Sequence, residues 1–173
     1  MDNIIVVAKK AIKNQSQLPF SVYSSHKEQM ITNVPIIKPL LIFILSGPKQ
    51  LGKSGSVECL SGRCVLLSNS PRIDMRNIPI QAEYFAVLID FEHEDFSELP
   101  KSPAPYKKYF QGDINPVLAS ALCQFMEFSS IAPAQVMRLR KREILEIIYH
   151  SGYKDVCNIV EPPSLSEKVQ SMI

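Results

Sequence analysis

Histidines are the first side chains to test for chemistry, because imidazole is the commonest transition-metal ligand in proteins. A metal site in a β-barrel needs histidines on neighbouring strands, usually with a carboxylate. His26 lies before the buried strand-like segments of this chain, and His150 ends a helical pattern. His93 stands between Glu92 and Glu94, where a solvated linker is favoured over a surface metal site. We therefore expect no metal ligands and no cofactor.

Residues 47–54, GPKQLGKS, satisfy the phosphate-binding pattern G-x-x-x-x-G-K-[ST]. In a nucleotide-binding protein this loop joins a strand to a helix, and its backbone N–H groups hold the phosphates. Strand-forming residues interrupted by glycine follow Ser54, and no Walker B carboxylate within βαβ units appears. A G-x-S-x-G nucleophile elbow is also absent. We expect no enzyme and no ATP hydrolysis, and keep a cupin-like barrel enzyme or nucleotide-binding protein as the alternative function.

The four cysteines are Cys59, Cys64, Cys123 and Cys157, and no C-x-x-C pair occurs among them. Cys59 and Cys64 flank a turn and could face each other across a hairpin, which leaves a disulfide as the minor alternative. Free thiols in a reducing compartment are the more frequent arrangement for such a composition. We expect a cytoplasmic protein with four free cysteines.

Charge and hydropathy bear on two classes of partner. The net charge of +2 is too small to indicate nucleic-acid binding by itself. The basic run Arg138–Arg142 is followed by Glu143 and Glu146, as in a solvated helix face. The longest apolar run, residues 39–45, is far below the ~20 residues of a membrane span. The N-terminus has no cleavage site of a signal peptide, so we expect no membrane partner.

The segments that would position a site begin with short strands over residues 20–91. Ile36 to Ser46 is nearly all apolar, as expected of a strand buried on both faces, and Gly47–Pro48 ends it. Residues 83–91 have the same character, and shorter strand patterns fall at 20–24, 57–60, 64–68 and 75–80. Turns recur every ten residues or so, which predicts an antiparallel sandwich or barrel.

A helical period replaces the strand pattern after a charged, proline-bearing linker at 92–114. Asn115 and Pro116 provide a cap and a first position, and a second helix opens at Pro133 and ends before Gly152. Residues 115–152 are therefore predicted as a helical hairpin, 153–173 as the start of a further helix, and 1–19 as an arm or short helix. The fold class expected is α+β: an antiparallel cupin-like β-barrel followed by two to three helices.

Three segments in this order resemble the sensor domain of AraC-family bacterial transcription regulators. KPLLIFILSGPKQLGKSGSVECLSGRCVLLSNSP, residues 38–71, is similar to the sensory barrel of that family. LASALCQFMEF and REILEIIYHSG are similar to its two helices, and SLSEKVQSMI to the helix that leads into the DNA-binding half. The resemblance covers residues 18–173 and implies a ligand-sensing barrel with dimerising helices. The family's two helix-turn-helix units are missing here, so we expect DNA contact only through that absent half.

An effector, if the barrel binds one, is expected to be a small apolar or aromatic molecule. Tryptophan is absent and few charges lie in the strands, so no sugar-binding signature exists. Strand positions predict a set of effector-contacting residues. These are Phe20, Tyr23, Phe43, Leu45, Leu67, Tyr84 and Val87. A module whose barrel interior is filled, with dimerisation as its only role, is the remaining alternative.

The second helix, residues 134–151, is predicted to form an antiparallel homodimer about a two-fold axis. Its apolar arc is wide enough to cover more than one neighbour, and soluble monomers rarely expose large apolar patches. A two-fold contact removes such a surface because the same patch meets itself. The residues predicted for dimerisation are Leu139, Ile144, Leu145 and Ile148.

Overall fold

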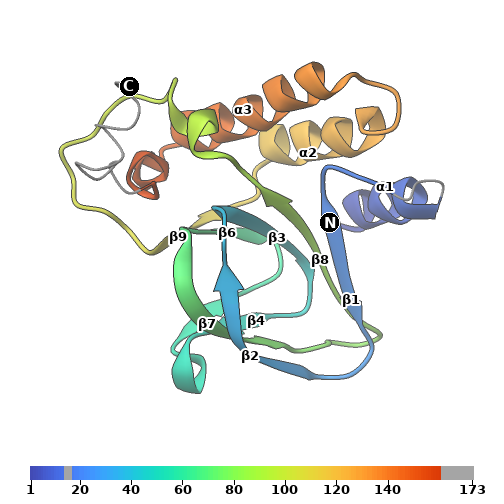
Figure 1. Cartoon of the computed structure of the whole chain (residues 1–173). Coiled ribbons are helices and arrows are strands. Elements are labelled where there is room, and N and C mark those ends of the chain that lie inside the picture. The colour runs from blue at the N-terminus through green and yellow to red at the C-terminus, as the bar shows by residue number, and fades with distance from the viewer. Residues whose placement is uncertain (14–16, 161–173) are drawn as a thin grey trace.

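The computed structural model describes residues 1–13 and 17–160. It contains two antiparallel β-sheets packed face to face, with a layer of helices against the outer face of the larger sheet (Figure 1). The larger sheet has five strands in the order β1-β8-β3-β6-β9, and the smaller has four in the order β2-β7-β4-β5. The expected α+β class with antiparallel sheets and following helices is confirmed. The sheets do not close into a continuous barrel, however, since no ladder joins them within residues 1–13 and 17–160.

The five-stranded sheet contains the most apolar segments of the sequence. Its strands are β1 (Ser21–Ser25), β8 (Tyr84–Asp90), β3 (Leu40–Ser46), β6 (Arg63–Leu67) and β9 (Tyr109–Asp113). In β3, Leu41, Phe43 and Leu45 face the helices, whereas Ile42 and Ile44 face the other sheet. Because successive side chains of a strand point to opposite faces, a strand covered on both sides must be apolar throughout. That requirement explains the uninterrupted run around Phe43.

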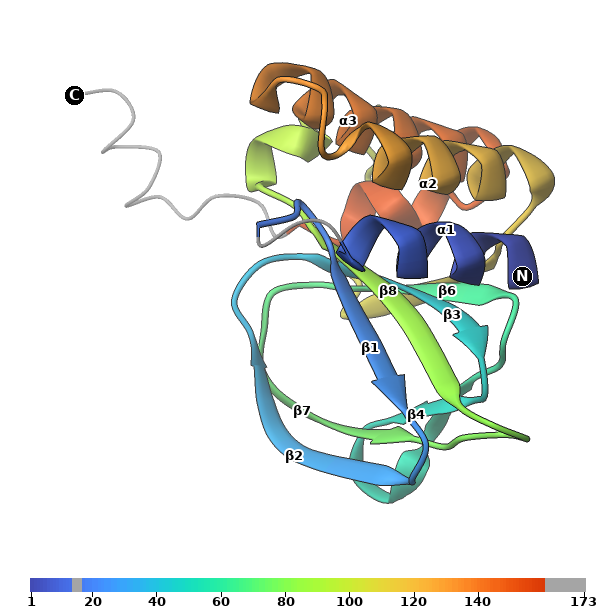
Figure 2. The ribbon, with the colours of Figure 1, turned by 90° about the vertical axis from the view of Figure 1, so that its right-hand side faces the viewer.

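The four-stranded sheet is more polar and covers only the inner face of the larger one (Figure 2). Its strands are β2 (Gln29–Ile36), β7 (Ser70–Asn77), β4 (Lys49–Leu51) and β5 (Val57–Cys59). β2 and β4 were not predicted as separate strands. β2 is an edge strand with mostly exposed or half-exposed side chains, and β4 follows Gly47–Pro48, so neither shows the apolar signal of a buried strand.

Three α-helices form the outer layer. They are α1 (Asp2–Lys13), α2 (Pro116–Phe128) and α3 (Ala134–His150), and single 3-10 turns occur as η1 (Lys53–Gly55), η2 (His93–Phe96) and η3 (Lys154–Asn158). The Asn115 side chain accepts a hydrogen bond from the backbone N–H of Leu118 at 2.9 Å, which caps α2 as expected. α1 packs against α2 through Ile4 and Ala8, both buried. Among the described residues, no helix combines the length and apolar character that a bilayer crossing requires.

The predicted linker at 92–114 is the main correction to the expected organisation. It contains η2 and, at its end, strand β9, which pairs with β6 along the edge of the five-stranded sheet. Gly112 lies against the Tyr153 ring, where a Cβ atom would stand 2.9 Å from Cε2. The absence of a side chain at Gly112 therefore permits a close contact between β9 and Tyr153, which directly precedes η3. Most of the predicted third helix, residues 161–173, lies outside the described residues.

Candidate functional site

Three polar side chains meet in the otherwise apolar layer between the sheets. Lys49, Asn77 and Tyr84 are 4%, 0% and 0% exposed, and we call them the inter-sheet cluster. Lys49 and Asn77 are paired across β4 and β7, so their side chains share a face. The Lys49 Nζ donates to Asn77 Oδ1 at 2.7 Å and lies 5.7 Å from the centroid of the Tyr84 ring, which comes from the opposite sheet. The cluster thus joins three strands of two sheets.

Charge in the inter-sheet cluster is not compensated. Burial lowers the pKa of Lys49 to about 8, and among the described residues no carboxylate pairs with it. The Tyr84 hydroxyl and the Asn77 Nδ2 have no hydrogen-bond partner in the described part of the chain. Burial also raises the pKa of the neighbouring Cys59 thiol to about 11, so that thiol is neutral near pH 7. The unpaired groups of the cluster itself can all donate, which suits an acceptor-rich anion, although the unpaired Gln29 Oε1 on the strand next to Asn77 is an acceptor.

Gly47 explains how the chain brings Lys49 inward. It adopts a φ of +77°, in the left-handed region that favours glycine, and a Cβ there would lie 2.4 Å from the Ile78 carbonyl oxygen. The turn therefore packs directly on the segment after β7, beside the Tyr84 ring. Lys49 follows two residues later and is directed between the sheets.

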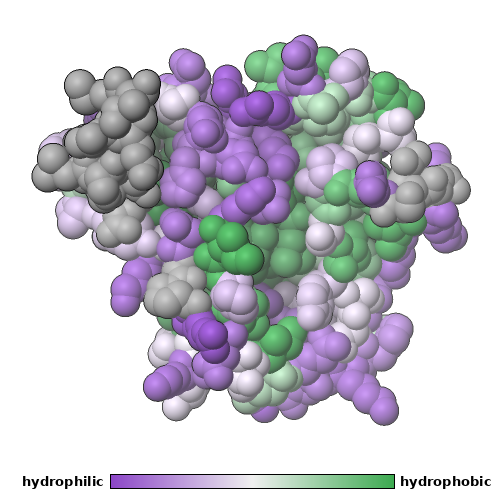
Figure 3. All heavy atoms as spheres, in the orientation of Figure 1, coloured by the Kyte–Doolittle hydropathy of each residue, from purple (hydrophilic) through white to green (hydrophobic). Residues whose placement is uncertain are grey.

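A groove at the opposite end of β3 opens onto the same inter-sheet layer. It has a volume of about 300 Å³ and includes Val34, Ile36 and Leu40, all of which pack on the apolar residues between the sheets. A second groove of about 170 Å³ adjoins it through Leu40 and Asp90. In Figure 3 an apolar area lies near the centre of this face, below hydrophilic residues over the helix layer. We call the two together the Asp90 groove.

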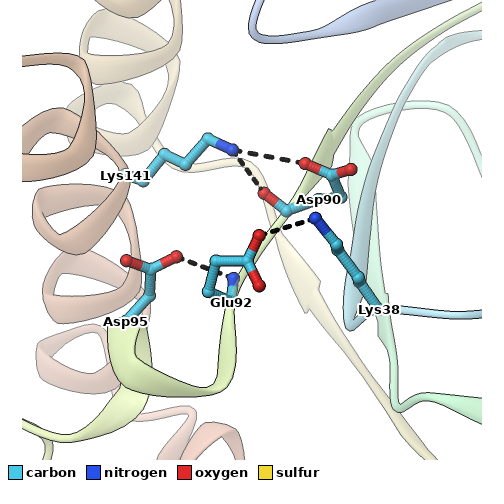
Figure 4. Close-up of polar contacts among 5 residues, drawn as sticks. All are labelled: Lys38, Asp90, Glu92, Asp95 and Lys141. Carbon is cyan, nitrogen blue, oxygen red and sulfur yellow. Dashed lines mark hydrogen bonds and ion pairs between the residues drawn. The ribbon is translucent and has the colours of Figure 1, made fainter. Parts of the chain in front are cut away.

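Ion pairs at the Asp90 groove connect the end of β8 to the helix layer (Figure 4). Lys141 of α3 donates to the backbone oxygen of Asp90 at 2.7 Å and to its Oδ1 at 3.3 Å. Lys38 pairs with Glu92 at 2.6 Å, and the backbone N–H of Glu92 donates to Asp95 Oδ2 at 2.8 Å. Every cation in this view therefore has an acidic partner, in contrast to Lys49.

Asp95 continues this connection into α3. Its carboxylate is buried, and its Oδ1 lies 3.8 Å from the Arg142 Nε, an ion pair without a hydrogen bond. Asp90 and Asp95 thus connect the exit of β8 to two successive positions of α3, Lys141 and Arg142. A change in the inter-sheet layer that moved β8 would be passed to α3 at these contacts.

Comparison with known proteins gives matches only at the level of structure. No family model matches the sequence, and no curated protein does. Apo ToxT K231A from Vibrio cholerae aligns with a TM-score of 0.63 and 14% identity, covering 92% of this chain and 65% of ToxT. ToxT bound to an unsaturated fatty acid aligns at 0.60 and 13%, covering 92% and 63%. CuxR, an AraC-like transcriptional activator, aligns at 0.55 and 14%, covering 85% and 55%.

The chain shares its fold with the matched parts of ToxT and of the AraC-like activator CuxR. The resemblance suggested by residues 38–71 and by the two helical segments is confirmed at this level. The chain spans 65% of the ToxT chain and 55% of the CuxR chain.

The residues predicted to contact an effector do not form one pocket in this sensor-type fold. Four of them lie between the five-stranded sheet and the helices, namely Phe20, Phe43, Leu45 and Val87. Leu67 and Tyr84 lie between the sheets, and Tyr23 is 38% exposed. Strand position alone cannot separate the two sides of a doubly covered sheet, which is why the set is divided. Lys49 and Asn77 were not predicted as site residues. Lys49 was missed because it follows the Gly47–Pro48 turn signal.

The predicted dimerisation residues need a similar correction. Ile144, Leu145 and Ile148 are at most 1% exposed and pack within the chain's own helix-side core. They are therefore unavailable to a partner subunit. Neighbouring elements of the same chain already cover the part of the α3 surface on which these three side chains lie. Leu139, at 62% exposed, is the one member of the set on the surface.

The remaining chemistry-bearing residues form no second site in the described chain. His26 Nδ1 lies 2.8 Å from the Ala82 carbonyl oxygen, and no group of three His, Cys, Asp or Glu side chains could hold a metal among the residues described. Cys59 and Cys64 are free and belong to opposite sides of the sheet. The string at 47–54 forms β4 and η1, and strand β5 follows it instead of a helix.

Proposed function

We propose that this chain is the effector-sensing domain of a cytoplasmic transcription regulator and has no catalytic activity. The observation that carries the proposal is the likeness of nearly the whole chain to ligand-bound ToxT. ToxT structures contain an unsaturated fatty acid or (E)-4-(8-methylnaphthalen-1-yl)but-3-enoic acid, both apolar carboxylic acids. For this chain we infer an effector of the same general kind, small and largely apolar. DNA binding would belong to a separate helix-turn-helix domain.

Transmission from the effector to such a domain is assigned to the contacts around Asp90. β8 lines the inter-sheet layer through Tyr84 and Ala86 and ends at Asp90, which Lys141 of α3 contacts. Effector binding that shifts β8 would favour one of two arrangements of α3, and the equilibrium between them would follow the effector. The linked domain would then respond to the position of α3.

A homodimer remains part of the proposal, with a changed contact surface. Leu139 and Val136 are 62% and 40% exposed on the same side of α3, and Ile131 in the preceding turn is 75% exposed. A two-fold contact along α3 would cover these side chains. A dimer would also present two DNA-binding domains at a fixed spacing.

A structural module without an effector is the second candidate. The observation in its favour is the packing of the inter-sheet layer, where Ile42, Ile44 and Val65 are fully buried. Such a module would need no ligand in order to fold or to dimerise.

Calorimetric titration of the purified chain separates these candidates. The panel contains octanoate, octanol, naphthalene-2-carboxylate and ATP, each added up to millimolar concentration. We expect saturable 1:1 binding of at least one apolar compound and none of ATP. Absence of binding by all three apolar compounds would overturn the sensing role and leave the structural module.

A further inference from the structure

We propose that the inter-sheet cluster of Lys49, Asn77 and Tyr84 is an anion subsite that holds the carboxylate of a monocarboxylic effector between the two sheets. This rests on the proposed sensing function and names the chemical class of ligand and the residues that would bind it. The ligand has one acidic head and an apolar body.

The first argument is the cost of the cluster in the free protein. Burying an ammonium group away from water without an opposite charge destabilises the folded chain. Lys49 is 4% exposed, and its one hydrogen bond is to a neutral amide oxygen of Asn77. A Met side chain would fill similar space without that cost. A bound carboxylate supplies the missing negative charge.

The second argument is that the unpaired hydrogen-bonding groups of the cluster can all act as donors. The Lys49 ammonium has three donors, of which one is used, and the Asn77 Nδ2 and Tyr84 hydroxyl are unpaired among the described residues. A carboxylate is acceptor-only and can take bonds from several donors at once. A metal cation is a poor occupant because the cluster already carries the positive charge of Lys49.

The third argument is the contrast with the other cations near the grooves. Lys38 is paired with Glu92 at 2.6 Å, and Lys141 with Asp90. An anion that bound either lysine would have to displace a carboxylate of the chain. An anion that binds Lys49 displaces no carboxylate of the chain. Lys49 is therefore a stronger anion site than Lys38 or Lys141, although it is more deeply buried.

The surroundings of the cluster suit the apolar body of the ligand. Ile42, Ile44 and Leu51 lie in the same layer, and the groove at Val34 and Leu40 reaches that layer from the surface. Because the layer is packed, a ligand that reaches Lys49 has to part the two sheets. In the described chain no β-ladder joins those sheets, so they can separate without loss of a strand pair.

The test compares octanoate with octanol, which shares its chain length and lacks its charge. Calorimetry at pH 7 is done on the parent chain, Lys49→Met, Tyr84→Phe and the matched control Lys38→Met. We expect Lys49→Met to weaken octanoate binding about tenfold or more and to leave octanol binding within about twofold, because a hydrogen-bonded charge is lost. Tyr84→Phe should weaken octanoate by a smaller factor, and Lys38→Met by less than about twofold.

The unliganded variants provide a second measurement that does not depend on binding. Lys49→Met should raise the melting temperature of the free chain, which also shows that the variant folds. Loss of octanoate binding in Lys38→Met but not in Lys49→Met would overturn the proposal and place the acid in the Asp90 groove. Equal octanoate affinity in all four chains would also overturn it, while the sensing function would stand. Failure of the parent chain to bind either compound would count against both.

Discussion

The two faces of the five-stranded sheet differ in what they bury. The helix-side core, which includes Phe43, Val87 and Leu122, consists of apolar side chains from strands and helices. The inter-sheet layer is apolar as well, yet it contains Lys49, Asn77 and Tyr84 with unpaired donors. Buried polar groups are normally hydrogen-bonded, so the exception identifies the side of the sheet that suits a ligand. Under our proposal, the helix-side core serves stability, and the inter-sheet layer has a lower stability because it contains a ligand site.

The largest effect is expected on the helix side. Phe43→Ala should lower the free energy of unfolding by about 3–5 kcal/mol, because it leaves a cavity in a core that is fully buried. Urea denaturation followed by circular dichroism measures this, with the half-exposed Tyr23→Ala as a control that should lose less than about 1 kcal/mol. A small loss at Phe43 would mean that the helix layer contributes less than its packing indicates.

The opposite sign is expected between the sheets. Lys49→Met should raise the free energy of unfolding at pH 7 by about 1–3 kcal/mol, because a buried charge without an opposite partner is replaced by an apolar chain. The same urea titration measures it. A loss of stability in this variant would show that the ammonium is compensated in the free protein, and the contrast between the two faces would disappear.

The pH dependence of stability sharpens the same contrast. The pKa of Lys49 is about 8 in the folded chain and near its ordinary value of 10.5 after unfolding, so the unfolded state binds more protons between these values. The contribution of Lys49 to stability should therefore rise between pH 8 and pH 9, by roughly 1 kcal/mol. The Cys59 and Cys64 thiols contribute with the opposite sign over the same range, since burial raises their pKa values from 9.0 to about 11 and about 12.

The control for that measurement is the chain with Lys49→Met. This variant keeps the buried thiols, so its own stability should fall from pH 8 to pH 9, and the stability of the parent chain relative to it should rise by roughly 1 kcal/mol. A difference between the two chains that does not change with pH would leave the burial of Lys49 without consequence for the pH dependence of stability.

A smaller stability effect is expected at the contact between the faces. Lys141→Met removes the bonds to Asp90, whose side chain is 56% exposed, and should cost less than about 1 kcal/mol. The main consequence of Lys141→Met should instead be a weaker coupling between octanoate binding and the conformation of α3. Hydrogen exchange of α3 should change when octanoate is added to the parent chain and stay unchanged in the variant at saturating ligand. An identical response in both chains would exclude Lys141 from the connection.

The smallest effect on unfolding is expected at Leu139. It is 62% exposed, so Leu139→Glu should alter the free energy of unfolding by less than about 0.5 kcal/mol. If α3 forms the dimer, light scattering should show a dimer for the parent chain and a monomer for this variant at the same concentration. The exposed Val117→Glu on α2 is the control and should stay dimeric. A monomeric parent chain would remove dimerisation from the proposal.

The sequence by itself determined the apolar strands and the helical hairpin. Around Phe43, uninterrupted apolar residues required a strand covered on both faces, and Asn115 and Gly152 marked helix ends through local hydrogen bonding and backbone conformation. These signals are local, because they depend on the spacing of side chains along one element or on one terminus. The order of the elements was then sufficient to suggest the sensor-type fold.

Only the tertiary structure decided which partner covers each face. Periodicity showed that Leu139, Leu145 and Ile148 belong to a wide apolar arc, but burial of Leu145 and Ile148 by the chain itself leaves Leu139 outside. Lys49 looked like part of a turn, and it is buried because β7 pairs with β4 and the opposite sheet covers both. Contacts between residues distant in sequence carry no local period, so neither the inter-sheet cluster nor the pairing of β9 with β6 could be derived from the sequence.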